Sequence, residues 1–394
     1  MDKTAIKNFA IESRKILRES AIKKAGMYGI TIDECSKPIQ KGADFEVYKT
    51  IAGDEIRLYS KELKMRSNLV NVINEKGFEQ VIEETAYTWF NRLIAIRFME
   101  VNDYLPTRVR VLSSETGNST PDIVTHALDV DLNLSADEID KIQAAKDDNR
   151  FDDAFQLLFV KQCNELNKIL PGLFQKTDDY MELLLDISYT SDGVVRMLVD
   201  DVAEDDFDVE KEGQVEIIGW LYQYYNTEPK NKIINVLKGS VVKKEEIPAA
   251  TQLFTTDWVV KYIVDNSVGR YWIERNPDSN LADKLEFFVK PKSGVINYID
   301  EKISPEDIDV LDNCMGSGHF LVYAMEVLML IYEECGYSER DAVQSILENN
   351  IYGLDIDQRA YQLAYFAVFM KARRMCSILW GRDKTSKIGY EKDN

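Results

Sequence analysis

Histidine and cysteine are scarce in this sequence, and neither is clustered. The 394 residues include two histidines and five cysteines, with no Cys-x-x-Cys pair. This scatter argues against a metal site and a disulfide framework, and therefore favours a reducing compartment. Residues 1–7 mix charges and lack a long apolar run, unlike a signal peptide or membrane span. We therefore expect no metal, no membrane segment and a cytoplasmic location.

An excess of basic charge is also absent. The formal net charge is −20, whereas surfaces that bind DNA are normally basic. No run of lysine and arginine marks a basic groove. Acidic chains usually present a solvated surface, and a surface adapted to a protein partner or mimicking DNA is the weaker alternative. If the protein acts on DNA, we expect most duplex contacts to lie beyond residue 394.

The most informative segment covers residues 308–357. A short apolar run, Ile308–Leu311, breaks into Gly316-Ser317-Gly318, and apolar residues at helical spacing follow. Residues 350–355 then read as a second strand that ends in Asp355. This order of strand, glycine turn, helix, strand and acid is the plan of a nucleotide-type pocket at the carboxyl ends of parallel strands.

Each part of this plan has a physical role. Gly316 and Gly318 let the backbone approach a ligand and permit positive φ in a tight turn. The start of the following helix favours a negative group such as a carboxylate. Asp355 can accept hydrogen bonds from two vicinal ribose hydroxyls.

The pattern discriminates between ligands. A dinucleotide fingerprint needs a third glycine where Leu321 stands, and no Gly-Lys-Ser/Thr of a phosphate-binding loop follows the glycines. S-adenosylmethionine fits better, because it has a carboxylate and a ribose but no pyrophosphate. On this local pattern alone, a purely structural glycine turn remains an alternative.

Several stretches resemble a known family. Residues 312–321 resemble motif I of the N6-adenine DNA methyltransferases, and residues 352–357 resemble their ribose-binding motif. Residues 247–258 resemble the segment that precedes motif I. Together with residues 86–93 and 219–225, these blocks make the chain similar to the N-terminal part of the PglX-type adenine-specific DNA methyltransferases of BREX phage-defence systems. Asn313 replaces the family proline, which leaves the turn less rigid.

The resemblance implies a fold and a cofactor. It implies a mostly α N-terminal domain over residues 1–240, and then, over 247–394, the start of a Rossmann-like α/β methyltransferase domain truncated after about two strands. The implied cofactor is S-adenosylmethionine, with the methionine end near Phe254 and Thr255 and the adenine near Ile356. The full implied cofactor set is Phe254, Thr255, Asp312, Met315, Gly316, Gly318, Asp355 and Ile356.

The catalytic motif of this family is missing. Transfer to an exocyclic adenine nitrogen requires Asn/Asp-Pro-Pro-Tyr/Phe, which holds the amino group and stacks on the flipped base. None of the nine prolines are adjacent, so no residue is assigned as catalytic. In the family order this motif follows the ribose acid, so we expect it beyond residue 394 and expect this chain alone to be inactive.

The resemblance therefore implies that this chain is an N-terminal fragment of a longer methyltransferase. The intact enzyme would methylate adenine N6 at specific sites of double-stranded host DNA by direct attack on the methyl sulfonium. Other defence-system proteins are further candidate partners. A non-catalytic adaptor of a defence complex is the alternative, and a nucleotide-binding oxidoreductase is disfavoured by the missing third glycine.

Helical periodicity organises the rest of the chain. It predicts helices over residues 4–25, 58–72, 81–101, 151–170, 214–225, 255–272 and 358–374. Residues 102–150 read as turn-rich, and a polar junction places the domain boundary at 235–247. Trp89, Phe90 and Arg92 could stack bases and bind phosphate, but their helical spacing favours core packing.

Overall fold

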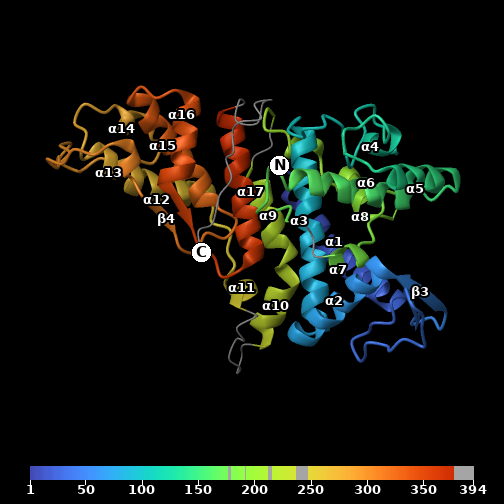
Figure 1. Cartoon of the computed structure of the whole chain (residues 1–394). Coiled ribbons are helices and arrows are strands. Elements are labelled where there is room, and N and C mark those ends of the chain that lie inside the picture. The colour runs from blue at the N-terminus through green and yellow to red at the C-terminus, as the bar shows by residue number, and fades with distance from the viewer. Residues whose placement is uncertain (176–178, 191, 212–214, 237–246, 377–394) are drawn as a thin grey trace. The chain divides into compact units, whose positions relative to one another are not determined.

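The computed structural model describes residues 1–175, 179–190, 192–211, 215–236 and 247–376 (Figure 1). The chain divides into two compact units, Met1–Gln214 and Val215–Asn394, and each is described by itself. Both units are mostly helical. The helix at Ile217–Tyr225 falls in the second unit by this division, whereas the sequence places the boundary later, at 235–247. The domain limits drawn from the sequence stay a prediction.

The first unit is built around long helices. Its described helices are α1 (Lys3–Met27), α2 (Ser60–Lys76), α3 (Phe78–Val101), α4 (Asp122–Thr125), α5 (Ala136–Asp147), α6 (Phe151–Leu166), α7 (Asp179–Leu183) and α8 (Val194–Asp201). Helix α3 is the centre of the core, because it is buried on nearly all sides and packs against α1 and α2. Trp89, Phe90 and Arg92 are at most 3% exposed, which confirms that they pack in the core.

A small antiparallel sheet also lies in the first unit, and the sequence did not predict it. Its strands β1 (Gln40–Lys41), β2 (Phe45–Lys49) and β3 (Glu55–Tyr59) pair in that order. The predicted helix at 58–72 was wrong at its start, because Leu58 and Tyr59 belong to β3. The Arg66 guanidinium lies over the Tyr48 ring and donates to the Tyr28 carbonyl, which fastens α2 to the sheet.

The second unit contains a parallel strand pair among helices. Its helices are α9 (Ile217–Tyr225), α10 (Thr227–Val236), α11 (Ile247–Thr251), α12 (Asp257–Val264), α13 (Arg270–Ile273), α14 (Leu281–Lys284), α15 (His319–Glu334), α16 (Glu339–Ser345) and α17 (Gln358–Met375). Strand β4 (Val310–Asp312) pairs in parallel with β5 (Ile351–Gly353). Helix α15 crosses from one strand to the other and contacts α12 and α17 (Figure 1).

Local signals explain where these elements begin and end. Gly318 has φ 81° and directly precedes α15, and Gly336, at φ 84°, lies just beyond its end. The Asp357 side chain accepts from the Arg359 N–H and caps α17. Between α15 and β5, helix α16 is extended by a π-helical turn over Ile346–Asn350. In the described part of the chain, no helix is both long and apolar enough to cross a membrane.

Candidate cofactor-binding site

The carboxyl ends of β4 and β5 lie side by side. The register pairs Leu311 with Tyr352 and Asp312 with Gly353, so the loops that follow the two strands leave the same edge. One of these loops is the glycine turn and the other carries Asp355. The Asp355 carboxylate accepts from the Gly316 N–H at 2.9 Å through one oxygen and from the Asp357 N–H at 2.8 Å through the other. Each oxygen keeps a second acceptor position.

The two glycines of the turn have different surroundings. Gly316 has φ 54°, and a Cβ built on it would meet no atom within 4 Å. Gly318 has φ 81°, and its Cβ would lie 3.0 Å from both Cα and Cβ of Ala364 in α17. Gly316 therefore keeps open the space above the turn, whereas Gly318 permits close packing of α15 on α17.

Asp312 ends β4 in a half-buried position. One carboxylate oxygen accepts from the Cys314 N–H at 3.1 Å, and the other, Oδ2, is buried without a hydrogen-bond partner among the described residues. Burial raises the pKa of Asp312, and the nearby charge of Asp355 raises it further. A buried acceptor oxygen with no donor is a position that a bound ligand or water would satisfy.

A second wall of the site comes from α9 and the loop before α12. The Phe254 N–H donates to the Gln223 side chain at 2.8 Å, and the Phe254 ring lies 4.7 Å from the ring of Trp220. A Cβ on Gly219 would come within 2.1 Å of the Phe254 ring. Glycine is therefore needed at residue 219 for Phe254 to lie against α9.

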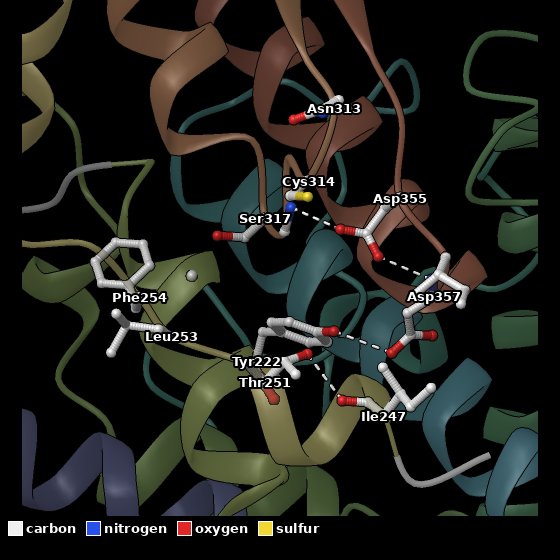
Figure 2. Close-up of a pocket in the computed structure, with 14 residues that line it drawn as sticks. Tyr222, Ile247, Thr251, Leu253, Phe254, Asn313, Cys314, Ser317, Asp355 and Asp357 are labelled. Carbon is white, nitrogen blue, oxygen red and sulfur yellow. Dashed lines mark hydrogen bonds between the residues drawn. The ribbon is translucent and has the colours of Figure 1, made fainter. Parts of the chain in front are cut away.

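Asp357 links this wall to the start of α17. Its carboxylate accepts from the Tyr222 hydroxyl at 3.0 Å (Figure 2) and from Nε of Arg359 at 2.8 Å. Burial raises the pKa of Tyr222 well above its ordinary value, and the Asp357 charge adds to this shift. The tyrosine is therefore a neutral hydrogen-bond donor that holds α9 beside the Asp355 loop.

These groups surround one pocket of about 530 Å³ (Figure 2). Its lining consists of Gly219, Tyr222, Ile247, Thr251, Gln252, Leu253, Phe254, Asn313, Cys314, Gly316, Ser317, Asp355, Ile356 and Asp357. The size lies within the range of small-molecule sites. Four of the eight residues expected from the sequence, namely Phe254, Gly316, Asp355 and Ile356, are part of this lining.

The other four expected residues lie around the pocket rather than on its surface. Thr255 turns its carbonyl to the His319 ring, and Asp312 lies beneath the turn. Met315 is buried, and its sulfur occupies the space beside Gly353. Gly318 packs on α17. The structure thus gathers all eight around one strand edge, and their role toward a ligand stays a prediction.

Sequence reasoning missed the contribution of α9. Gly219 and Tyr222 belong to the helix predicted over residues 214–225, which the sequence did not connect with the cofactor. The available signal was the glycine inside a helix rich in aromatic residues, which often marks a close approach by another side chain. Asp357, which caps α17, also accepts from Tyr222 and was not among the residues expected from the sequence.

The site and its supporting elements define a class of protein. A glycine turn after one parallel strand, tied to an acid after the next, is the arrangement in which proteins of the α/β type bind ligands at the carboxyl ends of strands. Along nearly its whole length, the chain is homologous to the PglX-type adenine-specific methyltransferases, which confirms the resemblance inferred from the sequence.

Two curated relatives carry this relationship. The adenine-specific methyltransferase PglX of Lacticaseibacillus casei (strain Zhang) is 46% identical over 401 residues, which cover 95% of this chain. The adenine-specific methyltransferase BrxX of Escherichia coli O9:H4 (strain HS) is 40% identical over 391 residues, which cover 97% of this chain. The chain spans about one third of the length of either relative, 33% and 32%. No protein-family model matches the chain.

Proposed function

We propose that the second unit binds S-adenosylmethionine and forms part of an N6-adenine DNA methyltransferase. The observation that carries this proposal is the bond between Gly316 and Asp355 at the mouth of a pocket of about 530 Å³. The homology to enzymes named as adenine-specific methyltransferases supports the same function. In this proposal β4, α15 and β5 are the first crossover of a Rossmann-like methyltransferase domain.

The pocket residues suit the parts of this cofactor. Asp355 has free acceptor positions for ribose hydroxyls, and Ile356, which is 65% exposed, offers an apolar surface for adenine. Phe254 and Thr255 would lie at the methionine end. The unpartnered oxygen of Asp312 would accept from a ligand group or a water. Met315 and Gly318 would shape the turn without touching the ligand.

The chemistry of the intact enzyme needs more than these residues. S-adenosylmethionine supplies an electrophilic methyl group on a sulfonium centre. The groups of this chain would bind and orient that cofactor, but no Asn-Pro-Pro-Tyr motif for holding a flipped adenine occurs in the 394 residues. We therefore propose that the chain alone binds cofactor and does not methylate DNA. Site-specific modification of host DNA in BREX defence, in the cytoplasm and with other defence proteins, belongs to the same proposal.

A non-catalytic adaptor is the second candidate, and an exposed sheet face would be its docking surface. Leu311 and Tyr352 are register partners on β4 and β5, and they are 60% and 42% exposed. Parallel sheets are normally covered on both faces. This face would be covered either by further sheet and helices of the enzyme or by a partner protein.

Calorimetric titration with S-adenosylmethionine tests the proposal. We expect one equivalent to bind the purified chain, and we expect no binding of NAD⁺, because the third glycine of the dinucleotide pattern is Leu321. A parallel assay with a labelled methyl group should show no transfer to DNA. Failure to bind S-adenosylmethionine would favour the adaptor, and measurable transfer would refute the statement that the chain alone is inactive.

A further inference from the structure

His319, the first residue of α15, holds a buried imidazole in a defined orientation. The residue is 7% exposed, and Nδ1 lies 3.1 Å from the carbonyl oxygen of Thr255. Because a carbonyl oxygen only accepts, Nδ1 must carry the proton of this hydrogen bond. With the proton on Nδ1, a neutral imidazole presents Nε2 as an acceptor.

Two carboxylates face this nitrogen. Nε2 lies 3.9 Å from Oε1 of Glu216 and 3.9 Å from Oδ1 of Asp257. Nε2 is buried and has no hydrogen-bond partner in the described part of the chain. The three ligand atoms lie within 4.8 Å of one another. Three electron-pair acceptors at this spacing repel one another unless a positive charge lies among them.

Against the expectation of no metal, which rested on the scatter of histidine and cysteine in the sequence, we propose that Glu216, Asp257 and His319 form a binding site for a divalent transition-metal ion of the Zn²⁺ type. Imidazole nitrogen and carboxylate oxygen are zinc ligands, and three protein ligands with an open fourth position are a common zinc arrangement. The hydrogen bond from Nδ1 to a backbone carbonyl is the usual way in which a metal-binding histidine is oriented. The two carboxylates balance the charge of the ion.

The distances allow the ion to bind after small movements. Zinc at about 2.1 Å from each ligand needs ligand atoms about 3.4 Å apart in a tetrahedral site. The carboxylates of Glu216, which is partly exposed, and Asp257, which is exposed, can rotate by that amount. A cavity of about 10 Å³ lies against Glu216 and His319, and Phe254 and Ser317 also line it.

The positive charge around the site makes both carboxylates necessary for binding a cation. Glu216 directly precedes α9, and Asp257 and His319 are the first residues of α12 and α15. Helix starts carry partial positive charge, which opposes a cation. Lys261 also lies 2.8 Å from the second oxygen of Asp257. Removal of either carboxylate should therefore weaken metal binding strongly.

An ion at this position would tie three helix starts together beside the cofactor pocket. The His319 ring stacks on the Phe254 ring, with centroids 4.7 Å apart and planes 3° apart. Phe254 is part of the pocket lining. The ion would thus fix the pocket wall, but its own binding does not depend on the assignment of the cofactor.

The test is a Zn²⁺ titration of the full chain after removal of metal with a chelator. We expect one equivalent by calorimetry, and an absorption spectrum of a low-coordinate site when Co²⁺ replaces Zn²⁺. His319→Gln and Asp257→Asn should weaken binding at least tenfold. His126→Gln removes the other histidine of the chain, and Asp309→Asn removes an exposed acid, so both should leave binding unchanged. Circular dichroism should show that all four variants fold.

Three results would overturn the proposal. The wild-type chain could bind no Zn²⁺, or His319→Gln could bind as tightly as the wild type. Binding that disappears in Cys314→Ser and persists in Asp257→Asn would assign the ion to the exposed Cys314 thiol instead. If the wild-type chain binds no Zn²⁺ and the ¹⁵N NMR shift of His319 Nε2 is that of a protonated nitrogen, a proton occupies the place proposed for the metal.

Discussion

The carboxylate of Asp355 accepts a 2.9 Å hydrogen bond from the backbone N–H of Gly316, which lies 39 residues earlier in the chain. This bond joins the turn after β4 to the loop after β5. The second carboxylate oxygen accepts from Asp357, the cap of α17. One side chain therefore orders both loops of the proposed pocket and also offers acceptor positions to a ligand.

Asp355→Asn should weaken binding of S-adenosylmethionine more than it weakens the fold. The amide keeps an acceptor for one N–H but loses the charge, and hydrogen bonds to charged groups contribute about 1.5–3 kcal/mol. We therefore expect the dissociation constant to rise by roughly 10- to 100-fold by calorimetry. Asp309→Asn, an exposed acid just before β4, is the matched control and should leave the constant unchanged. Equal affinities for the wild type and Asp355→Asn would contradict the role of Asp355.

Gly316→Ala should mainly weaken cofactor binding, whereas Gly318→Ala should mainly lower the stability of the fold. At Gly316 a Cβ meets no atom, so Gly316→Ala should cost about 1–2 kcal/mol for the left-handed backbone and reduce cofactor binding by intruding into the pocket. At Gly318 a Cβ meets the backbone of Ala364 at 3.0 Å, so Gly318→Ala should lose more stability. Thermal unfolding and cofactor titration of the pair measure both effects. The expectation fails if Gly316→Ala is the less stable variant.

The extent to which the sequence predicted this structure depends on how local each signal was. The strand, glycine turn and helix around Gly316 follow from adjacent residues, and their order was predicted, although the strand expected at Ile308–Leu311 is Val310–Asp312. The sheet at β1–β3 was missed, because its strands have only two to five residues and β3 runs directly into α2. The contributions of Gly219 and Tyr222 to the pocket could not be predicted, because they depend on how α9 packs against a loop distant in sequence. The approach of Glu216 and Asp257 to His319 is likewise a tertiary effect.

Asp312→Asn should stabilise the chain at neutral pH. Burial, and then the charge of Asp355, raises the pKa of Asp312, so the folded state favours its protonated form. This contribution to stability is present below the unfolded pKa of about 3.9 and is lost as the pH rises through the higher folded value. At neutral pH the carboxylate is therefore a cost, which asparagine removes while its amide oxygen still accepts from Cys314.

We expect Asp312→Asn to raise the melting temperature by roughly 2 °C at neutral pH, with a smaller gain toward pH 4. Thermal unfolding at a series of pH values measures this dependence, with Asp309→Asn as the exposed control. If Asp312 also accepts from the cofactor, the same variant should bind S-adenosylmethionine more weakly. A lower melting temperature at neutral pH would contradict the assignment of Asp312 as an electrostatic cost.

Glu100→Gln should destabilise the first unit strongly. The Glu100 side chain is fully buried and accepts from Arg97 at 2.8 Å and from the backbone N–H groups of Val111 and Leu112 at 2.7 and 2.8 Å. An amide at this position leaves the buried guanidinium of Arg97 with less compensating charge, which typically costs about 3 kcal/mol or more. Urea unfolding should show this loss. Lys15–Glu12 is an exposed pair, so Glu12→Gln should change stability by less than about 0.5 kcal/mol.

Gly219→Ala should disturb the pocket wall through Phe254. The added Cβ would lie 2.1 Å from the Phe254 ring and 2.8 Å from the Ser317 hydroxyl, so the ring must move away from α9. We expect a loss of about 1–3 kcal/mol from this overpacking and weaker cofactor binding. Phe254→Ala removes the obstacle, so the two changes should not be additive. A double-mutant cycle by thermal unfolding should show that Gly219→Ala costs less in the Phe254→Ala background than in the wild type. Equal costs in both backgrounds would mean that Gly219 and Phe254 do not pack together, and α9 would then not form this wall of the pocket.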